Sequence, residues 1–139
     1  MTPVNHPVFQ AELYRQRRAQ LASRIREQSG GGIAILSTAQ EQLRNRDSEF
    51  PYRHDSDFFY LTGFDEPGAT LVLQVDRNTV LAHIFCRPKD SEREIWDGLR
   101  LGPEAAPDYL GVDHAYPNSE LDQELPKLLA DQTALYIRL

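Results

Sequence analysis

The chain has 139 residues, a length that fits one domain with a core of its own. Its 15 Lys and Arg against 21 Asp and Glu give a net charge of -6. This balance argues against broad nucleic-acid binding, which usually needs a basic face. No stretch approaches the ~20 apolar residues of a membrane span. The only cysteine, Cys86, excludes an internal disulfide and fits a reducing compartment. We therefore expect a cytoplasmic protein that binds neither nucleic acid nor membrane.

The first predicted element is a helix over residues 9–28, because apolar side chains recur at helical spacing from Phe9 to Ile25. Three glycines, residues 30–32, should end it. The short apolar run over residues 32–37 is typical of a central strand. Five arginines of the helix stand among polar residues and are interpreted as a solvated face: Arg15, Arg17, Arg18, Arg24 and Arg26.

The middle of the chain predicts three more strands. The first covers residues 58–61, directly after a long polar segment. The other two, over 69–75 and 80–86, are separated by a tight turn at 76–79 and should form a hairpin. Residues 87–95 are charged and predict a loop.

The C-terminal part alternates helices and strands. Helices are predicted over 104–110 and 118–131, with a brief strand at 113–116 between them and an apolar strand at 133–139. This order indicates an α/β domain, with a mixed sheet flanked by helices. Natural chains more often finish on a polar tail than on a core strand. We therefore expect a fragment cut at a domain boundary, with another domain following.

Acidic residues and one histidine gather in the polar segment before residue 58. Such oxygen and imidazole groups could ligate Mn, Mg or Zn, but turn capping and ion pairs with neighbouring arginines explain them as well and are favoured. Arg53, beside Tyr52, could bind a carboxylate through its fork or pair internally. The metal-ligand candidates are Asp47, Glu49, His54, Asp55 and Asp57.

Three single residues are considered as functional groups. One has two possible interpretations, and the other two suggest no chemistry. Trp96, the only tryptophan, lies among charged residues and is either folded onto the core, as composition favours, or an exposed anchor for a partner. Cys86 ends an apolar run and is interpreted as a small buried residue. His83 should alternate outward on its strand and is interpreted as incidental. The residues by themselves contain no self-sufficient active site.

Two separated motifs carry a family resemblance. One covers residues 46–47, 50–53, 55–64 and 66–67, and the other covers residues 94–106 with 110–112. In this order they resemble the N-terminal domain of bacterial Xaa-Pro aminopeptidases (aminopeptidase P), over a region from about Phe9 to the end of the chain. The resemblance implies a single creatinase/prolidase-type N-terminal domain over residues 1–139. Its fold should be ribonuclease-H-like, with a mixed sheet flanked by helices.

The resemblance also implies an activity for the parent protein. Family members remove an N-terminal residue that precedes proline, and a dinuclear metal site, usually two Mn(II), activates a bridging water. The metal ligands are two Asp, one His and two Glu of a C-terminal metallopeptidase domain, whose motifs this chain lacks. The chain alone is expected to be catalytically inactive and to hold no metal.

The family suggests where the domain meets its partners. The residue matching Trp96 lies on a loop that can reach a neighbouring subunit's active site, and the residue matching Asp47 lies near the cleft. Tyr52 and Arg53 are further motif positions for a cleft or subunit contact. The implied partners are the C-terminal catalytic domain, other subunits of a homo-oligomer, and Xaa-Pro peptides. The alternative is a stand-alone non-catalytic module of the same fold that binds peptides or partner proteins.

Overall fold

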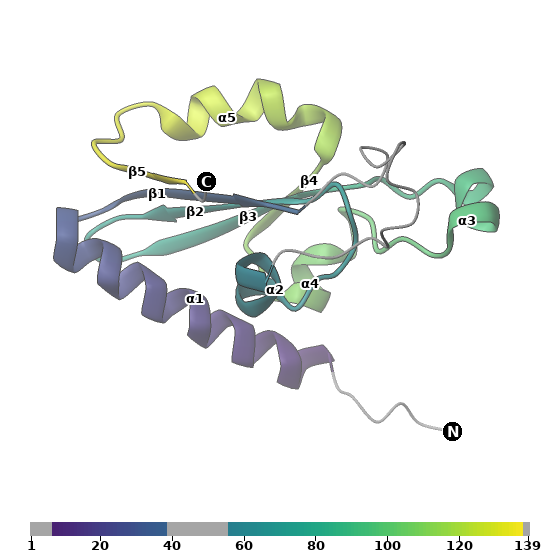
Figure 1. The fold of residues 1–139 in the computed structure, drawn as a ribbon, viewed down its shortest axis with the longest axis horizontal. Coiled ribbons are helices and arrows are strands. Elements are labelled where there is room, and N and C mark those ends of the chain that lie inside the picture. The colour runs from purple at the N-terminus through teal and green to yellow at the C-terminus, as the bar shows by residue number, and fades with distance from the viewer. Residues whose placement is uncertain (1–6, 39–55, 138–139) are drawn as a thin grey trace.

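The computed structural model describes residues 7–38 and 56–137. Within these ranges, a five-stranded mixed sheet carries helices on both faces, as Figure 1 shows, so the predicted α/β class is confirmed. Several candidate site residues lie outside the described ranges: Asp47, Glu49, Tyr52, Arg53, His54 and Asp55.

The sheet has the strand order β4-β3-β2-β1-β5. Antiparallel pairing joins β1 to β2 and β2 to β3, whereas β3 with β4 and β1 with β5 pair in parallel. The predicted hairpin is confirmed, because the Asp76 amide donates to the Thr79 carbonyl over 2.9 Å in the β2–β3 turn. The strands are β1 (Gly32–Ser37), β2 (Thr70–Val75), β3 (Val80–Cys86), β4 (His114–Pro117) and β5 (Leu135–Ile137).

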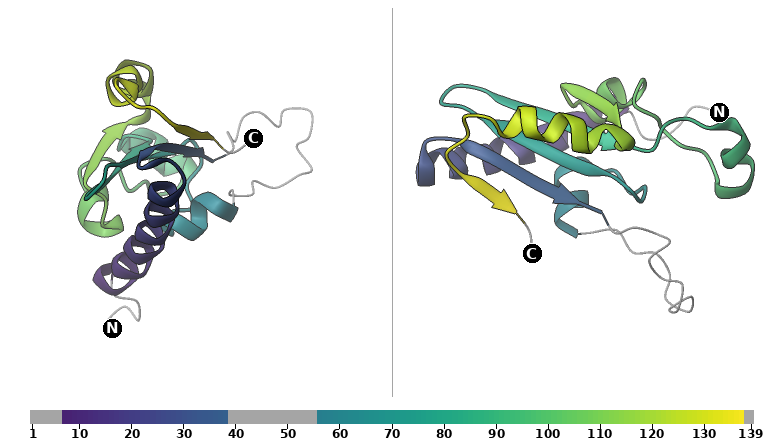
Figure 2. Two further views of the ribbon diagram at one scale, coloured as in Figure 1. Left: turned by 90° about the vertical axis from the view of Figure 1, so that its left-hand side faces the viewer. Right: turned by 90° about the horizontal axis from the view of Figure 1, so that it is seen from above.

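The helices divide between the two faces of the sheet. Helices α1 (Pro7–Ser29), α2 (Ser56–Thr62) and α4 (Ala106–Leu110) cover one face, and α5 (Leu121–Leu129) covers the other, preceded by the 3-10 turn η2 (Asn118–Glu120). Helix α3 (Ser91–Asp97) stands away from both layers, as Figure 1 and the right-hand view of Figure 2 show. No helix among the described residues is both long enough and apolar enough to cross a membrane.

Both faces of the sheet carry apolar clusters. The larger one lies beneath α1, α2 and α4 and joins buried residues such as Ile25, Phe58 and Leu73. The smaller one centres on Ile33, Val72 and Phe85, and its outer layer comes mainly from the leucines of α5. Strand side chains alternate between these clusters, as expected for a sheet covered on both sides.

Residues 58–61 form part of helix α2, so the predicted strand is wrong. Phe58 and Leu61 are three positions apart and both buried, which is the spacing of one helical face, whereas Tyr60 is exposed. The helix ends at Gly63, whose φ of 72° suits a glycine cap and whose amide donates to the Phe59 carbonyl over 2.7 Å. Aromatic residues favour strands only weakly, so packing against α1 determines that this segment is helical.

The arginines of α1 do not all face solvent, so the predicted solvated face is wrong for Arg17 and Arg18. Arg18 is 3% exposed, and its two terminal nitrogens donate to the carbonyls of Leu61 and Gly111, each over 2.9 Å. Arg17 donates to the Tyr60 carbonyl over 3.1 Å. Carbonyls at helix ends lack partners within the helix, and these guanidinium groups supply donors at the ends of α2 and α4.

Two buried side chains of β3 carry polar groups. Cys86 is buried as predicted, and burial raises the pKa of its thiol to about 12. His83 is 3% exposed, so the prediction that it points outward is wrong. Its Nε2 lies 3.0 Å from Gln74 Oε1, and its ring stacks on His114 with centroids 5.1 Å apart. Neither side chain offers a reactive surface group.

The last predicted strand forms, but at the edge of the sheet rather than in the core. Within β5, Leu135 is 50% exposed and Ile137 is 55% exposed. Only Tyr136 packs against the larger cluster, and its hydroxyl lies 2.8 Å from Ser29 Oγ.

Replacing Phe58 with alanine should lower the free energy of unfolding by about 3–5 kcal/mol, because a fully buried ring leaves a cavity in the larger cluster. Chemical denaturation measures the change. Tyr60→Phe is the matched control on the same helix, and we expect it to change stability by less than about 0.5 kcal/mol. A loss below about 1 kcal/mol in Phe58→Ala would contradict the packing described for α2.

Replacing Arg18 with lysine should destabilise the domain by about 1.5–3 kcal/mol, because an ammonium cannot serve two separated carbonyls as a planar fork does. The control is Arg24→Lys on the same helix, where the side chain is exposed and the change should stay within about 0.5 kcal/mol. Equal stability of the two variants would show that the Arg18 fork contributes nothing beyond charge.

Candidate functional site

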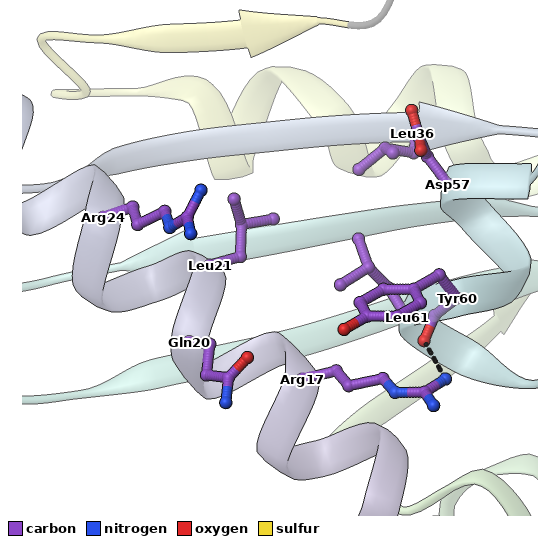
Figure 3. A pocket seen from close by; sticks show the side chains of 8 residues that line it. All are labelled: Arg17, Gln20, Leu21, Arg24, Leu36, Asp57, Tyr60 and Leu61. Carbon is purple, nitrogen blue, oxygen red and sulfur yellow. Dashed lines mark hydrogen bonds between the residues drawn. The ribbon is translucent and has the colours of Figure 1, made fainter.

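A cavity of about 410 Å³ lies between α1, α2 and β1 (Figure 3). Asp57 is the one carboxylate in its lining, and it contains no histidine or cysteine. Such a lining suits binding rather than proton transfer or nucleophilic attack, which need paired titratable groups. The lining residues are Arg17, Gln20, Leu21, Arg24, Leu36, Asp57, Tyr60 and Leu61.

A second candidate is the arm, which we define as residues 88–101 with α3 at its centre. The arm carries three large apolar side chains in water: Ile95 is 76% exposed, Trp96 is 85% exposed and Leu99 is 84% exposed. The core position that composition favours for Trp96 is therefore wrong, and the exposed position that the family resemblance favours is confirmed. Exposed apolar groups gathered on one projection are typical of surfaces that contact a protein, a membrane or a ligand.

The arm contains a helix where the sequence predicted a loop. Asp90 adopts an extended conformation and its carboxylate accepts from the Arg93 amide over 3.2 Å. In return, the Glu94 carboxylate accepts from the Asp90 amide over 3.0 Å. This reciprocal capping resembles the capping box, with the glutamate one position later than usual. The acidic spacing of 90 and 94 was the signal that could have predicted α3.

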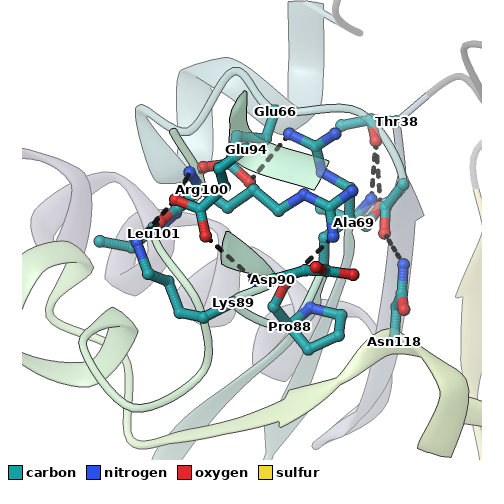
Figure 4. A network of polar contacts seen from close by, with 12 residues as sticks. Thr38, Glu66, Ala69, Pro88, Lys89, Asp90, Glu94, Arg100, Leu101 and Asn118 are labelled. Atoms are coloured by element: carbon teal, nitrogen blue, oxygen red, sulfur yellow. Dashed lines mark hydrogen bonds and ion pairs between the residues drawn. The ribbon is translucent and has the colours of Figure 1, made fainter. Parts of the chain in front are cut away.

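The Glu94 carboxylate connects the segments on both sides of α3 at the base of the arm, as Figure 4 shows. Besides the Asp90 amide, it accepts from Lys89 Nζ over 2.9 Å and from the Arg100 amide over 3.1 Å. Lys89 Nζ also donates to the Arg100 carbonyl over 2.8 Å. The two chain segments that lead into and out of α3 are thus tied to each other.

Glu66 attaches the arm to the rest of the domain. Its carboxylate accepts from the Leu101 amide over 2.8 Å and lies 3.4 Å from Arg87 Nη2. Leu101 ends the arm and Arg87 directly precedes it, so one side chain holds both ends. The polar base is therefore well connected, while the tip presents apolar side chains to solvent.

Hydrogen bonds to Glu94 also change its acidity. The bond from Lys89, followed by the amide bonds from Arg100 and Asp90, lowers the pKa of the Glu94 carboxyl to about 2. The carboxylate therefore stays ionised, and the arm stays tied, throughout the physiological pH range.

Of the predicted cleft or subunit-contact residues, Trp96 lies at the exposed tip of the arm. Asp47, Tyr52 and Arg53 lie outside the described residues. Of the metal-ligand candidates, only Asp57 is described, in the first turn of α2. Within residues 7–38 and 56–137, no group of three or more His, Cys, Asp or Glu side chains could hold a metal ion. The described residues therefore do not fit a dinuclear metal site.

The mixed sheet with helices on both faces and the projecting arm define an α/β domain, and comparison with known proteins gives its family. Residues 14–136 match the family described as aminopeptidase P, N-terminal domain. The chain belongs to this family.

The relatives are much longer than the region that this chain matches. The chain is 44% identical to the Xaa-Pro aminopeptidase of Escherichia coli over 87% of its own length and 27% of the relative. It is 42% identical to the Haemophilus influenzae enzyme, over 90% and 28% of the two lengths. The structure matches aminopeptidase PepP of Pseudomonas aeruginosa with a TM-score of 0.81 and 42% identity, over 93% of this chain and 28% of that one. The chain thus spans about 28% of its solved relative.

The arm should loosen in acid. Because the folded pKa of Glu94 is lowered from 4.5 to about 2, its contribution to stability is complete above about pH 4.5 and is lost as the pH falls toward 2. NMR titration should show the amide signals of Asp90 and Arg100 shifting together with a midpoint near 2. In Glu94→Gln both shifts should vanish, and a midpoint near 4.5 in the native chain would contradict the network.

Proposed function

We propose that this chain is the non-catalytic N-terminal domain of a Xaa-Pro metallo-aminopeptidase. The parent enzyme would remove the N-terminal residue that precedes proline. The observation that carries the proposal is the family match over residues 14–136, joined to 44% identity with a relative named Xaa-Pro aminopeptidase. The single cysteine is consistent with a cytoplasmic location for this enzyme.

Catalysis in the parent would belong to a C-terminal metallopeptidase domain that this chain does not include. Two Mn(II) ions, or another divalent pair, would activate water there. The described residues of the present chain offer no ligand cluster, so no step of the reaction is assigned to them. The chain alone should not turn over a peptide.

The proposed role of this domain is to shape the substrate cleft and to form contacts between subunits of a homo-oligomer. The arm supports the second part, because its exposed tip offers a tryptophan and two leucine-sized side chains on a connected polar base. Tryptophan is enriched among residues that dominate binding energy. Asp47, Tyr52 and Arg53 are proposed as cleft or contact residues on the strength of the motif alone.

A stand-alone interaction module remains the second candidate, and the exposed arm favours it as well, because an apolar tip would equally serve a partner protein. The two proposals differ in whether joining this chain to a catalytic domain gives an active peptidase. If the parent is an enzyme, the two domains joined together should cleave peptides. An interaction module would bind partners and cleave nothing.

Activity separates these proposals. We would fuse the chain to the part of the Escherichia coli relative that lies outside the matched region, and assay an Xaa-Pro peptide with Mn(II). Turnover by the fusion, with none by the 139-residue chain, supports the proposed function. A folded fusion that binds peptide without cleaving it would support the module instead, and turnover by the chain alone would contradict both.

Replacing Trp96 with alanine should leave the stability of the chain within about 0.5 kcal/mol of its native value, because the side chain is exposed. In the fusion, the same change should reduce peptidase activity or subunit assembly. Tyr109→Ala, which removes an exposed aromatic residue of α4, is the matched control.

Fluorescence checks the exposure of Trp96 directly, since the chain contains no other tryptophan. We expect emission typical of an indole in water, with ready quenching by iodide. Blue-shifted, protected emission from a dilute monomer would contradict an exposed arm.

A further inference from the structure

Packing does not set the direction in which the arm leaves the domain. Among the described helices and strands, none packs extensively against α3, and the side chains at the tip of the arm are exposed. The hydrogen bonds of Glu94 join the two chain segments of the arm to each other. They preserve its internal structure but do not orient it. A contact with the rest of the domain is needed to aim the arm relative to the sheet.

Glu66 makes such a contact from outside the arm. Its side chain is 15% exposed, and its two oxygens serve different segments. Oε2 accepts from the Leu101 amide over 2.8 Å, and Oε1 lies 3.4 Å from Arg87 Nη2. The Nε of Arg87 is buried and has no hydrogen-bond partner among the described residues. Glu66 thus places a negative charge opposite a guanidinium that is largely withdrawn from water.

The turn at residues 66–69, which carries this carboxylate, is fixed on two further sides, as Figure 4 shows. The Ala69 amide donates to Thr38 Oγ1 over 2.9 Å, and its carbonyl accepts from the Thr38 amide over 2.9 Å, directly after β1. The Gly68 carbonyl accepts from Asn118 Nδ2 of η2 over 2.9 Å. The turn therefore connects the arm both to the central strand and to the helical layer of α5.

The charges that make these contacts at the base of the arm balance, with three cations and three carboxylates. A balanced set of paired charges does not favour capture of an external anion or metal ion. We therefore interpret the base as a device that holds the arm rather than as a ligand site. The cations are Arg87, Lys89 and Arg100, and the carboxylates are Glu66, Asp90 and Glu94.

We propose that Glu66 is a positioning residue, which sets the direction in which the arm presents Trp96 and takes no part in the reaction itself. The proposal rests on the proposed function, because it needs a parent enzyme whose substrate cleft the arm helps to shape. The apolar side chains of the tip cannot transfer a proton or ligate a metal, so an aimed tip offers binding contacts. Loss of the aim should therefore raise KM and leave kcat nearly unchanged.

Backbone relaxation measured by NMR tests the aim of the arm in the 139-residue chain itself. In the native chain we expect the α3 amides to have order parameters of about 0.85, as in a rigid backbone. In Glu66→Ala these values should fall together below about 0.6. The chemical shifts of α3 should stay helical, because Glu94 still holds the internal structure of the arm.

Two further variants make this measurement decisive. Glu104→Ala removes an exposed glutamate shortly after the arm and should leave the α3 order parameters unchanged. Glu66→Gln keeps an oxygen for the Leu101 amide but loses the charge opposite Arg87, so its values should lie between those of the native chain and Glu66→Ala. It also replaces Glu66→Ala if that variant does not fold. Native order parameters in both Glu66 variants would overturn the proposal.

Kinetics of the fusion with the remainder of the Escherichia coli relative test the consequence for an Xaa-Pro peptide. Trp96→Ala should raise KM by about tenfold, because an exposed tryptophan at a contact carries much of the binding energy. Glu66→Ala should raise KM at least about threefold, with kcat within about twofold of the native value. KM does not depend on the fraction of folded enzyme, so a role of Glu66 in stability alone would leave KM unchanged.

Combining Glu66→Ala with Trp96→Ala shows whether Glu66 acts through the tryptophan. If it does, the double variant should have the KM of Trp96→Ala, because an arm without its tryptophan has no contact left to misplace. KM effects that multiply would show that Glu66 acts independently of the tip and would overturn the proposal. An unchanged KM in Trp96→Ala would overturn it as well.

Failure of the proposed function gives a different result from failure of the positioning role. A native fusion without turnover removes the proposed function, and the order parameters of the chain then decide whether Glu66 aims the arm. An active native fusion whose KM is the same in Glu66→Ala keeps the proposed function and removes the positioning role.

Discussion

A buried guanidinium holds the helical layer of this domain together. Arg18 lies on α1, and its two terminal nitrogens donate at the same time to the Leu61 carbonyl in the last turn of α2 and to the Gly111 carbonyl just after α4. Burial lowers its pKa to about 10, so it remains a cation at neutral pH. A buried charge that lost its acceptors would be costly. The three helices must therefore keep one relative arrangement, which also places Tyr60 and Leu61 in the lining of the cavity between α1, α2 and β1.

The two candidate binding surfaces are built by opposite means. The cavity between α1, α2 and β1 has apolar walls that pack against the core, so its shape follows from packing around Leu21 and Leu36. The arm has no core beneath it. Its order comes from carboxylates, Glu94 within the arm and Glu66 outside it, that accept amide hydrogens from the returning segment. A polar base of this kind lets Trp96 stay in water without collapsing onto the sheet.

Local signals explain what the sequence predicted well. The glycines at 30–32 end α1, and the turn at 76–79 joins two β-branched strands, so these elements were predictable from neighbours in the chain. Helix α2 was not, because its aromatic run also suits a strand and burial against a distant helix decides. The burial of Arg18 was not predictable either, because contacts with distant parts of the chain cause it. Its partners lie 43 and 93 residues away, and helical spacing alone cannot reveal them. Composition favoured a core position for Trp96, whereas the structure leaves its side chain exposed, because the arm offers no core to cover it.

The pairing of β1 has a consequence for folding during synthesis on the ribosome. Its neighbour on one side, β2, is made soon after it, and the β1-β2-β3 meander can form from nearby chain. Its neighbour on the other side, β5, lies about a hundred residues later, as the pair Ile33 and Leu135 shows. Until β5 emerges, the outer edge of β1 stays open to pairing with strands of other chains. The nascent chain is thus most prone to mispair during synthesis of residues 76–134.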